Sequence, residues 1–383
     1  MLERRDKMTL KDKYAIVGVG HTRIGKVPEM SDYGLQVEAA KRAMDDAGLK
    51  KTDIDGMITH SHMLGGIRVH HQRVAQRLGM DTAFGVSIST GGATSCVMAQ
   101  LAAAAIEAGF CHTVLCVHGD KALTRGGETH DGDREFGPEF GLFGAAAVHA
   151  FGATRHMHEY GTTHDHLGAI AVACRKHAQL NPHAQIRKPM SLQDYHDSAW
   201  IVWPYHMLDC CLRSDGAAAF IVTSAERARD LRTRPVYIMG MGRANNSRGP
   251  YHGDHMIETG GKASGEQAFR MAGITPRDID VAQIYDCFTY IAMVTLEDYG
   301  FCKKGEGGPF VSGGRVELGG ELPINTSGGM LSEGYVEGML QIVEGVRQMR
   351  GECGPRQVKD AEIGIVSGNG GNAVCHSTLI LRR

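Results

Sequence analysis

The sequence lacks the features that would place it with nucleic-acid-binding or membrane proteins. Its 41 lysine and arginine residues nearly balance 43 aspartate and glutamate residues, which leaves a formal charge of −2. This charge gives no electrostatic reason to expect nucleic acid or a membrane surface as a partner. No apolar run approaches the ~20 residues that a membrane span needs. Residues 1–13 are charged and lack the apolar centre of a secretory signal. We therefore expect a soluble, cytoplasmic protein.

The sequence also lacks any pair of cysteines with C-x-x-C spacing, although it contains ten cysteines. Cys210 and Cys211 are adjacent and the others are scattered. A zinc site is not expected from this spacing. Free thiols in a reducing compartment fit better. We predict no bound metal and no cofactor.

Glycine, in contrast, is abundant at 51 residues, and one glycine-containing turn stands out. The segment Ser-Thr-Gly-Gly-Ala-Thr-Ser-Cys (89–96) lies between an expected strand at 84–88 and an Ala-rich expected helix at 97–109. A strand–turn–helix elbow places a side chain at the start of a helix, where free N–H groups favour negative charge. Nucleophilic serine and cysteine often occupy such elbows. The residue at the elbow therefore decides much of the chemistry.

The two halves of the chain repeat the same series of landmarks. Each half contains a strand ending in Gly-x-Gly, a helix ending in Ala-Gly, an Asp-Ile-Asp triplet and a second strand. The expected strands are 14–20, 56–60, 236–242 and 281–285. The Ala-Gly and Asp-Ile-Asp landmarks recur at one common offset, which indicates a duplicated α/β unit. Two further segments, 362–366 and 373–381, are expected to form the closing hairpin of the second unit.

These landmarks predict two halves, at residues 13–230 and 231–383. A long, His-rich stretch at about 120–205 interrupts the first half. We expect this stretch to be irregular and to cover the site.

Several short motifs then carry a resemblance. They are Tyr160-Gly161-Thr162, Lys176-His177, Asn181-Pro182, Cys210-Cys211, Ser214-Asp215-Gly216, Tyr285-Asp286-Cys287-Phe288, Gly305-Glu306-Gly307 and Asn325-Thr326-Ser327-Gly328-Gly329. Together they resemble the thiolase superfamily, and most closely its sterol-carrier-protein-type members. The resemblance implies a duplicated five-layer α-β-α-β-α architecture with a loop-domain insertion in the first half. It also implies a homodimer.

Thiolases work with four catalytic positions, and the resemblance places all four on substituted residues. The nucleophilic cysteine falls on Gly92, and the histidine of Gly-His-Pro falls on Tyr335. The Asn or His that holds a water falls on Tyr285, and the C-terminal cysteine falls near Ser367. Gly92 has no side chain with which to form an acyl-enzyme. Ordinary thiolysis is therefore not expected.

A glycine elbow with two tyrosines resembles the thiolase-like aldolases of steroid side-chain degradation. Those proteins cleave a β-hydroxyacyl-CoA by retro-aldol reaction, with a small partner subunit of OB-fold and zinc-ribbon type. The resemblance implies that Tyr285 and Tyr335 serve as acid and base, in either assignment. Asp286 either orients Tyr285 or caps a turn. The expected substrate-binding residues are Gly92, Asp286, Ser367, Gly370 and Gly371, with His252 and His255 on an expected loop.

Two other functions stay open at this point. One is a β-ketoacyl-CoA thiolase or acyltransferase subunit that uses Cys96 or Ser95 as an atypical nucleophile, although the position of Cys96 one helical turn into the helix favours a packing role. The other is a non-catalytic acyl-CoA- or lipid-binding protein, since every thiolase catalytic residue is replaced.

Overall fold

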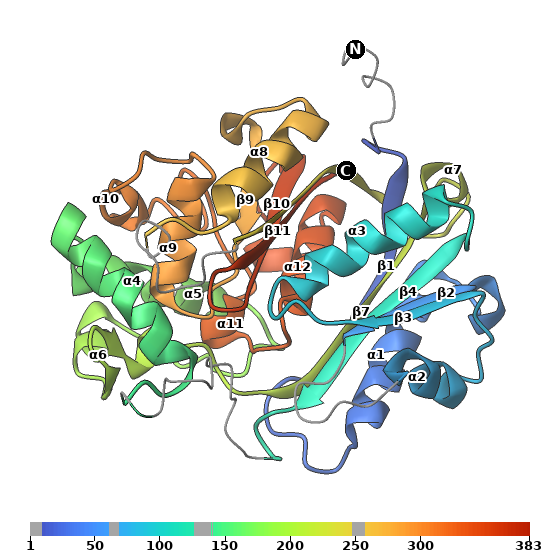
Figure 1. The fold of residues 1–383 in the computed structure, drawn as a ribbon, viewed down its shortest axis with the longest axis horizontal. Coiled ribbons are helices and arrows are strands. Elements are labelled where there is room, and N and C mark those ends of the chain that lie inside the picture. Colours follow the sequence, from blue (N-terminus) through green and yellow to red (C-terminus); the bar gives the residue numbers. More distant parts are fainter. Residues whose placement is uncertain (1–9, 61–68, 126–138, 140, 247–256) are drawn as a thin grey trace.

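The computed structural model describes residues 10–60, 69–125, 139, 141–246 and 257–383. In this part of the chain nine strands form one sheet, in the order β3-β2-β4-β7-β1-β8-β11-β10-β9 (Figure 1). The strands are β1 (Tyr14–His21), β2 (Gly56–His60), β3 (Phe84–Ile88), β4 (Thr113–Lys121), β7 (Asp215–Ser224), β8 (Val236–Asn245), β9 (Val281–Gln283), β10 (Ile363–Gly370) and β11 (Cys375–Arg382).

The pairing pattern of this sheet repeats outward from its centre. On one side, β1 pairs antiparallel with β7, β7 antiparallel with β4, and β4 parallel with β2. On the other side, β8 pairs antiparallel with β11, β11 antiparallel with β10, and β10 parallel with β9. The two sides meet where β1 pairs with β8. Strand pairing thus follows the repeat in the sequence, while the halves at 13–230 and 231–383 stay a prediction.

Helices separate the strands into layers. Helix α1 (Asp32–Ala47) packs on β1, β4 and β7, and α8 (Gly261–Ala272) packs on β8 and β11. Between the two units lie α3 (Thr94–Glu107) and α12 (Met339–Arg350), which contact strands of both (Figure 1). Helix α2 (His70–Leu78) lies beside α1. The predicted α-β-α-β-α order is confirmed.

The Gly-x-Gly pair at the end of the first strand in each unit has a packing cause. A Cβ atom on Gly18 or Gly20 would overlap the backbone of α1, and one on Gly240 or Gly242 would overlap the backbone of α8. Each outer helix can therefore lie directly against its strand only because these side chains are absent. The same requirement in both units explains why the motif occurs twice.

The expectation of an irregular insertion at 120–205 was wrong. The segment contains α4 (Gly144–Tyr160), α5 (His164–Gln179) and α6 (Leu192–His196), followed by the hairpin β5 (Trp200–Val202) and β6 (Tyr205–His206). Thr163 and His166 form a capping box at the start of α5. Alanine and histidine fill much of α4 and α5, so polarity contrasts little around these helices and the helical period is hard to see in the sequence.

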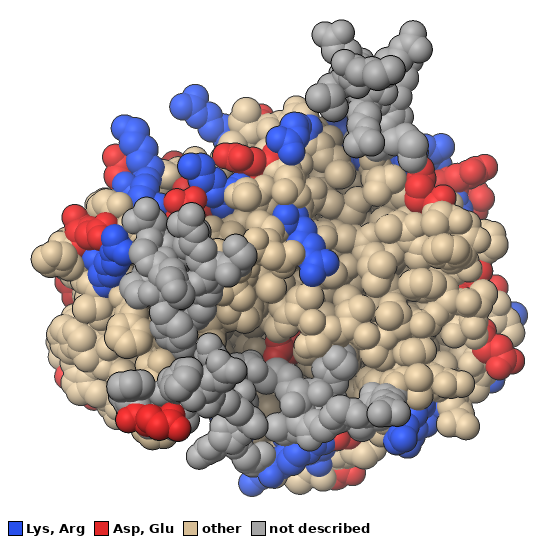
Figure 2. All heavy atoms as spheres, in the orientation of Figure 1, with Lys and Arg blue, Asp and Glu red and all other residues tan. Residues whose placement is uncertain are grey.

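Four other α-helices lie in the described part of the chain. They are α7 (Ala225–Ala228), α9 (Thr289–Asp298), α10 (Gly307–Val311) and α11 (Gly329–Ser332). Among the described residues, no helix is both long and apolar enough to cross a bilayer. Figure 2 shows lysine and arginine scattered over one face, mostly toward its edges, with acidic side chains among them.

Candidate active site

A cavity of about 420 Å³ opens where the two units meet. Segments of both units contribute to it. They are the elbow after β3, the end of β4, the start of α4, the segment before β7, the segment after β9, the segment before α12 and the β10–β11 turn. Its walls include Gly91, Gly92, His118, Asp120, Phe143, His149, Ile201, Cys210, Cys211, Arg213, Tyr285, Cys287, Phe288, Tyr335, Glu337, Asn369, Gly370 and Gly371. Side chains far apart in the sequence therefore share one enclosed space.

Two tyrosine hydroxyls face each other in this cavity. The Tyr285 and Tyr335 Oη atoms are 3.0 Å apart, and each hydroxyl has no other partner among the described residues. The Tyr285 N–H donates to Ser367 Oγ at 2.8 Å, and the Tyr335 N–H donates to Ser214 Oγ at 3.0 Å. Both phenols are thus positioned through their own backbones, and their hydroxyls remain available to a ligand.

Both phenols hold their protons firmly. Burial, followed by the negative charge of Glu337, raises the pKa of Tyr285 and of Tyr335 well above the usual 10. At neutral pH each is a neutral hydrogen-bond donor.

Gly92 leaves the space that Tyr285 fills. A Cβ atom on Gly92 would overlap the Tyr285 hydroxyl and ring. The adjacent Gly91 has φ = 57° and packs against the Gly370 backbone, while Gly371 has φ = 58° at the β10–β11 turn. Backbone from both units therefore meets beneath the tyrosine pair, and a nucleophilic side chain at the elbow would have no room.

Comparison with known proteins agrees with this geometry. Residues 242–383 match the family model described as thiolase C-terminal domain-like. The chain is 39% identical to the 17-hydroxy-3-oxo-4-pregnene-20-carboxyl-CoA lyase of Mycobacterium tuberculosis, over 89% of this chain and 92% of that protein. It is 36% identical to the steroid side-chain-cleaving aldolase of Thermomonospora curvata, over 88% and 90%. The chain belongs to the thiolase superfamily.

Within this superfamily the chain groups with sterol-carrier-protein-type thiolase-like proteins, and its own elbow carries Gly92 instead of a nucleophilic cysteine. A solved structure described as the Ltp2-ChsH2(DUF35) aldolase superposes with a TM-score of 0.90 at 35% identity. The match covers 98% of this chain and 99% of that chain. The predicted thiolase fold is confirmed.

Asp286 does not line the cavity, so its expected contact with substrate is replaced by a supporting role. Its carboxylate accepts hydrogen bonds from the Met330 N–H at 2.9 Å and from the Leu331 N–H at 3.4 Å, at the start of α11. Burial raises its pKa to about 6. Of the two hypotheses for this residue, the structure supports capping: Asp286 positions the segment that leads to Tyr335.

Ser367, the position of the C-terminal thiolase cysteine, likewise does not line the cavity. Its hydroxyl is fully buried and accepts the Tyr285 N–H described above. The expected substrate contact is thus replaced by a bond that holds a tyrosine. His252 and His255, which were expected on a loop near the pocket, lie outside the described residues.

The atypical nucleophiles considered from the sequence are not in the cavity. Helix α3 begins at Thr94 rather than at 97, because the Thr90 N–H donates to Thr94 Oγ1 at 2.8 Å and closes the elbow earlier. Ser95 and Cys96 therefore lie inside the helix and are buried. Burial raises the pKa of the Cys96 thiol to about 12. Neither residue can reach an acyl group, which removes the thiolase alternative that depends on them.

Sequence reasoning missed several polar residues in the cavity, including Glu337 and Asn369. Glu337 lies two residues after Tyr335, is almost fully buried and has φ = 47°. Asn369 is also buried, and its Nδ2 donor has no hydrogen-bond partner in the described structure. The sequence offered a signal for each of these residues. Glu337 stands two residues after the catalytic position Tyr335, and Asn369 lies inside the motif Ser-Gly-Asn-Gly-Gly.

Cysteines also line this cavity. Burial raises the pKa of Cys211 and of Cys287 well above the usual range. These thiols are protonated and are poor nucleophiles.

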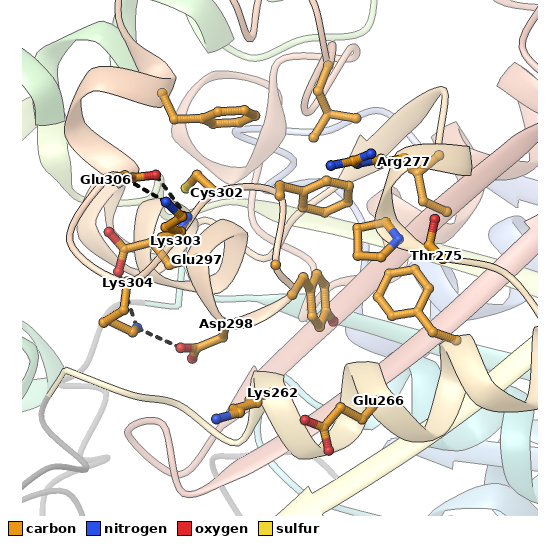
Figure 3. Close-up of a pocket in the computed structure, with 18 of the residues that line it drawn as sticks. Lys262, Glu266, Thr275, Arg277, Glu297, Asp298, Cys302, Lys303, Lys304 and Glu306 are labelled. Atoms are coloured by element: carbon orange, nitrogen blue, oxygen red, sulfur yellow. Dashed lines mark hydrogen bonds and ion pairs between the residues drawn. The ribbon is translucent and has the colours of Figure 1, made fainter.

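A larger hollow, of about 1260 Å³, lies between α8 and the segment after α9 (Figure 3). Lys304 donates to Asp298 at 2.7 Å and lies 3.2 Å from Glu297, so the buried charges of this hollow are paired with each other. None of the predicted site residues that the structure describes lines it. Size alone therefore does not identify the active site.

Within the described ranges, His, Cys, Asp and Glu side chains form no group of three or more that could hold a metal ion.

Proposed function

We propose that this protein is a carbon–carbon lyase that cleaves a bulky β-hydroxyacyl-CoA by retro-aldol reaction. The products are a ketone or aldehyde and acetyl-CoA or propionyl-CoA. One observation carries the proposal: a tyrosine hydroxyl, bonded to a second tyrosine hydroxyl, fills the space of the thiolase nucleophile. A retro-aldol step needs acid–base groups and no nucleophile.

The cavity supplies groups for each requirement of this step. The Tyr285–Tyr335 pair can exchange protons with the β-hydroxyl group and with the enolate carbon. The developing enolate oxygen needs hydrogen-bond donors. The unpartnered amide of Asn369 can donate, together with backbone N–H groups near Gly92, Gly370 and Gly371. No cofactor beyond the CoA of the substrate takes part.

A steroid-derived acyl group is the substrate that we propose. The names of the two relatives above specify a pregnene carboxyl-CoA and a steroid side chain. Apolar side chains from the insertion and the second unit, Phe143, Ile201 and Phe288, line the cavity here. Such walls suit a large apolar group.

Incubation with a panel of β-hydroxyacyl-CoA esters, without free CoA, tests the proposal. We expect release of a carbonyl compound and a shorter acyl-CoA, because retro-aldol cleavage does not consume CoA. Cleavage only of β-ketoacyl-CoA, and only after CoA is added, would show thiolysis instead. Binding without turnover, with the partner protein present, would indicate an acyl-CoA- or lipid-binding protein.

A small OB-fold and zinc-ribbon partner is part of the proposal. The similar solved aldolase carries a second component in its name, ChsH2(DUF35). Large apolar side chains are exposed at Phe143 and Ile201, which line the cavity, and at Trp200, Trp203 and Met207, in and next to the β5–β6 hairpin that carries Ile201. Exposed apolar patches of this kind often contact other proteins. Co-purification with the protein encoded next to this one, followed by the assay above, tests whether the partner is needed.

We also propose a homodimer, formed along the sheet edge at β3. Phe110 is 63% exposed and stacks on Phe84 of this strand. A groove of about 460 Å³ runs between Ile88 and Leu101 beside it. An exposed edge strand with apolar side chains can pair with a second copy of the chain.

We also propose that the protein is located in the cytoplasm, because all ten cysteines are free.

Replacing Phe110 and Leu101 together by aspartate is expected to shift the protein from dimer to monomer, because two charges would be buried in the interface. Light scattering after size-exclusion chromatography measures the molecular mass in solution and so distinguishes dimer from monomer. Phe151→Asp, at an exposed site on α4, is the control. A double variant that remains dimeric would place the interface elsewhere.

A further inference from the structure

The tyrosine pair alone leaves the proton balance of the reaction incomplete. A retro-aldol step must first take a proton from the β-hydroxyl group. Both phenols are protonated at neutral pH, for the reasons given above. A protonated phenol accepts a proton only if it passes its own proton on at the same time. A further acceptor is therefore needed within reach of the pair.

Glu337 lies in the right place for this acceptor. Its side chain lines the same cavity as both tyrosines, and only 4% of the residue is exposed. It follows Tyr335 by two residues and precedes Gly338, the residue before α12. In its carboxylate form a glutamate side chain is a hydrogen-bond acceptor only, so it can take up a proton from a neighbouring phenol.

The backbone at Glu337 is costly for a glutamate. A φ of 47° lies in the left-handed region, where residues other than glycine are strained by about 1 kcal/mol. Glycine would relieve this strain, and glycine occupies the next position with φ = 79°. The chain therefore keeps a glutamate side chain in the cavity at an energetic cost.

Other charged side chains of the cavity are weaker candidates. Burial lowers the pKa of His149 to about 4, so this imidazole holds a proton poorly. Asp120 is already engaged by other groups: it lies 3.7 Å from the Arg125 guanidinium, and its Oδ1 accepts the Lys121 N–H. The remaining charged or titratable side chains in the wall are His118, Arg213, Cys210, Cys211 and Cys287. Arginine cannot accept a proton, and the thiols already hold theirs. The His118 ring packs edge-on against the His60 ring, with centroids 4.6 Å apart.

We infer that Glu337 is the proton acceptor of the cleavage step and acts through Tyr335. This inference rests on the proposed lyase function. The β-hydroxyl proton passes to the Tyr335 oxygen while the Tyr335 proton passes to the Glu337 carboxylate. The O–H electron pair forms the new C=O bond, the carbon–carbon bond breaks, and its electrons form the thioester enolate.

The same chain of groups then works in reverse. Tyr285 donates its proton to the enolate carbon, which yields the shorter acyl-CoA. Tyr335, 3.0 Å away, replaces that proton, and Glu337 returns its proton to Tyr335. The proton that left the hydroxyl group is balanced by the one that reaches carbon, and all three side chains return to their initial state.

Glu337→Gln tests the inference, because it keeps the size of the side chain and removes its basicity. We expect kcat to fall by about 100-fold or more, the range typical for loss of a general base. KM should change little, because binding contacts remain. Glu337→Asp should recover part of kcat. Glu337→Gly relieves the backbone and opens space, so added formate should restore part of its lost activity.

Glu333→Gln is the matched control. Glu333 is buried four residues upstream, does not line the cavity and is held by Ser327 and Asn181. Burial raises the pKa of Glu333 to about 8, so at neutral pH its carboxyl group is mostly protonated and, like the amide of glutamine, uncharged. Its kcat should stay close to that of the wild type.

The outcomes separate this inference from the proposed function. Wild-type kcat in Glu337→Gln, beside inactive Tyr335→Phe, would overturn the role of Glu337 and leave the lyase intact. Loss of activity in Glu337→Gln without any rescue of Glu337→Gly by formate would also overturn it. A wild-type protein that cleaves no β-hydroxyacyl-CoA, alone or with its partner, would refute the function itself.

Discussion

Tyr335→Phe and Tyr285→Phe are each expected to reduce kcat by about 10³-fold, near the middle of the range for loss of an acid–base group. Each change removes one hydroxyl from the pair and interrupts proton transfer between the β-hydroxyl group and the enolate carbon. Steady-state cleavage rates measure the effect. Thermal unfolding should change little, because one hydrogen bond contributes about 1 kcal/mol.

Tyr299→Phe provides a control for this pair of variants. Tyr299 is a buried tyrosine whose hydroxyl bonds Thr378 at 2.7 Å, and it does not line the active-site cavity. Removal of the Tyr299 hydroxyl group should leave kcat near the wild-type value. Full activity in both Tyr285→Phe and Tyr335→Phe would contradict the assignment of these residues to acid–base chemistry.

Gly92→Ala is the second variant with a large expected effect. The added methyl group would overlap the Tyr285 ring and hydroxyl and crowd the Asn369 carbonyl. Overpacking of this kind typically costs about 1–3 kcal/mol of folding free energy. Displacement of Tyr285 should also lower kcat by at least about 100-fold, because small misplacements of catalytic groups are costly. Chemical denaturation and cleavage rates measure the two effects.

A double-mutant cycle shows whether the overlap causes the loss. In a Tyr285→Ala background, Gly92→Ala should cost less stability, because the ring that it meets is absent. An equal cost in both backgrounds would show that Gly92 and Tyr285 do not compete for space. Gly92→Cys should likewise fail to restore thiolysis, because the tyrosine blocks the elbow.

The duplicated fold was predictable because its signals are local and occur twice. Gly-x-Gly, Ala-Gly and Asp-Ile-Asp each mark a close helix–strand contact or the end of an element, and these contacts recur in both units. The helices of the insertion were missed, because alanine and histidine hide their period. Local composition therefore predicts an element only when its two faces differ in polarity.

The site was predictable only in part, for a related reason. Family positions identified Tyr285 and Tyr335, and the structure brings their hydroxyls together. No pattern distinguished residues that line the cavity from residues that hold its walls, so Asp286 and Ser367 were expected to contact substrate. Glu337 and Asn369 enter the cavity through the path of the backbone around Gly338 and the β10–β11 turn. That backbone path depends on how the two units pack against each other, and no single sequence motif predicts this packing.

The meeting of the two units at the cavity has a consequence for how such an enzyme can change. The groups proposed to move protons, Tyr285, Tyr335 and Glu337, all follow β8 in the chain. Residues before β8 contribute the glycine elbow, the end of β4, the insertion and the segment before β7 to the cavity wall. The proposed proton-transfer groups and much of the substrate-facing wall are thus carried by different stretches of one polypeptide. Mutations in the insertion can alter which acyl group fits without disturbing proton transfer, so lineages of this enzyme are free to diversify in substrate while keeping one reaction.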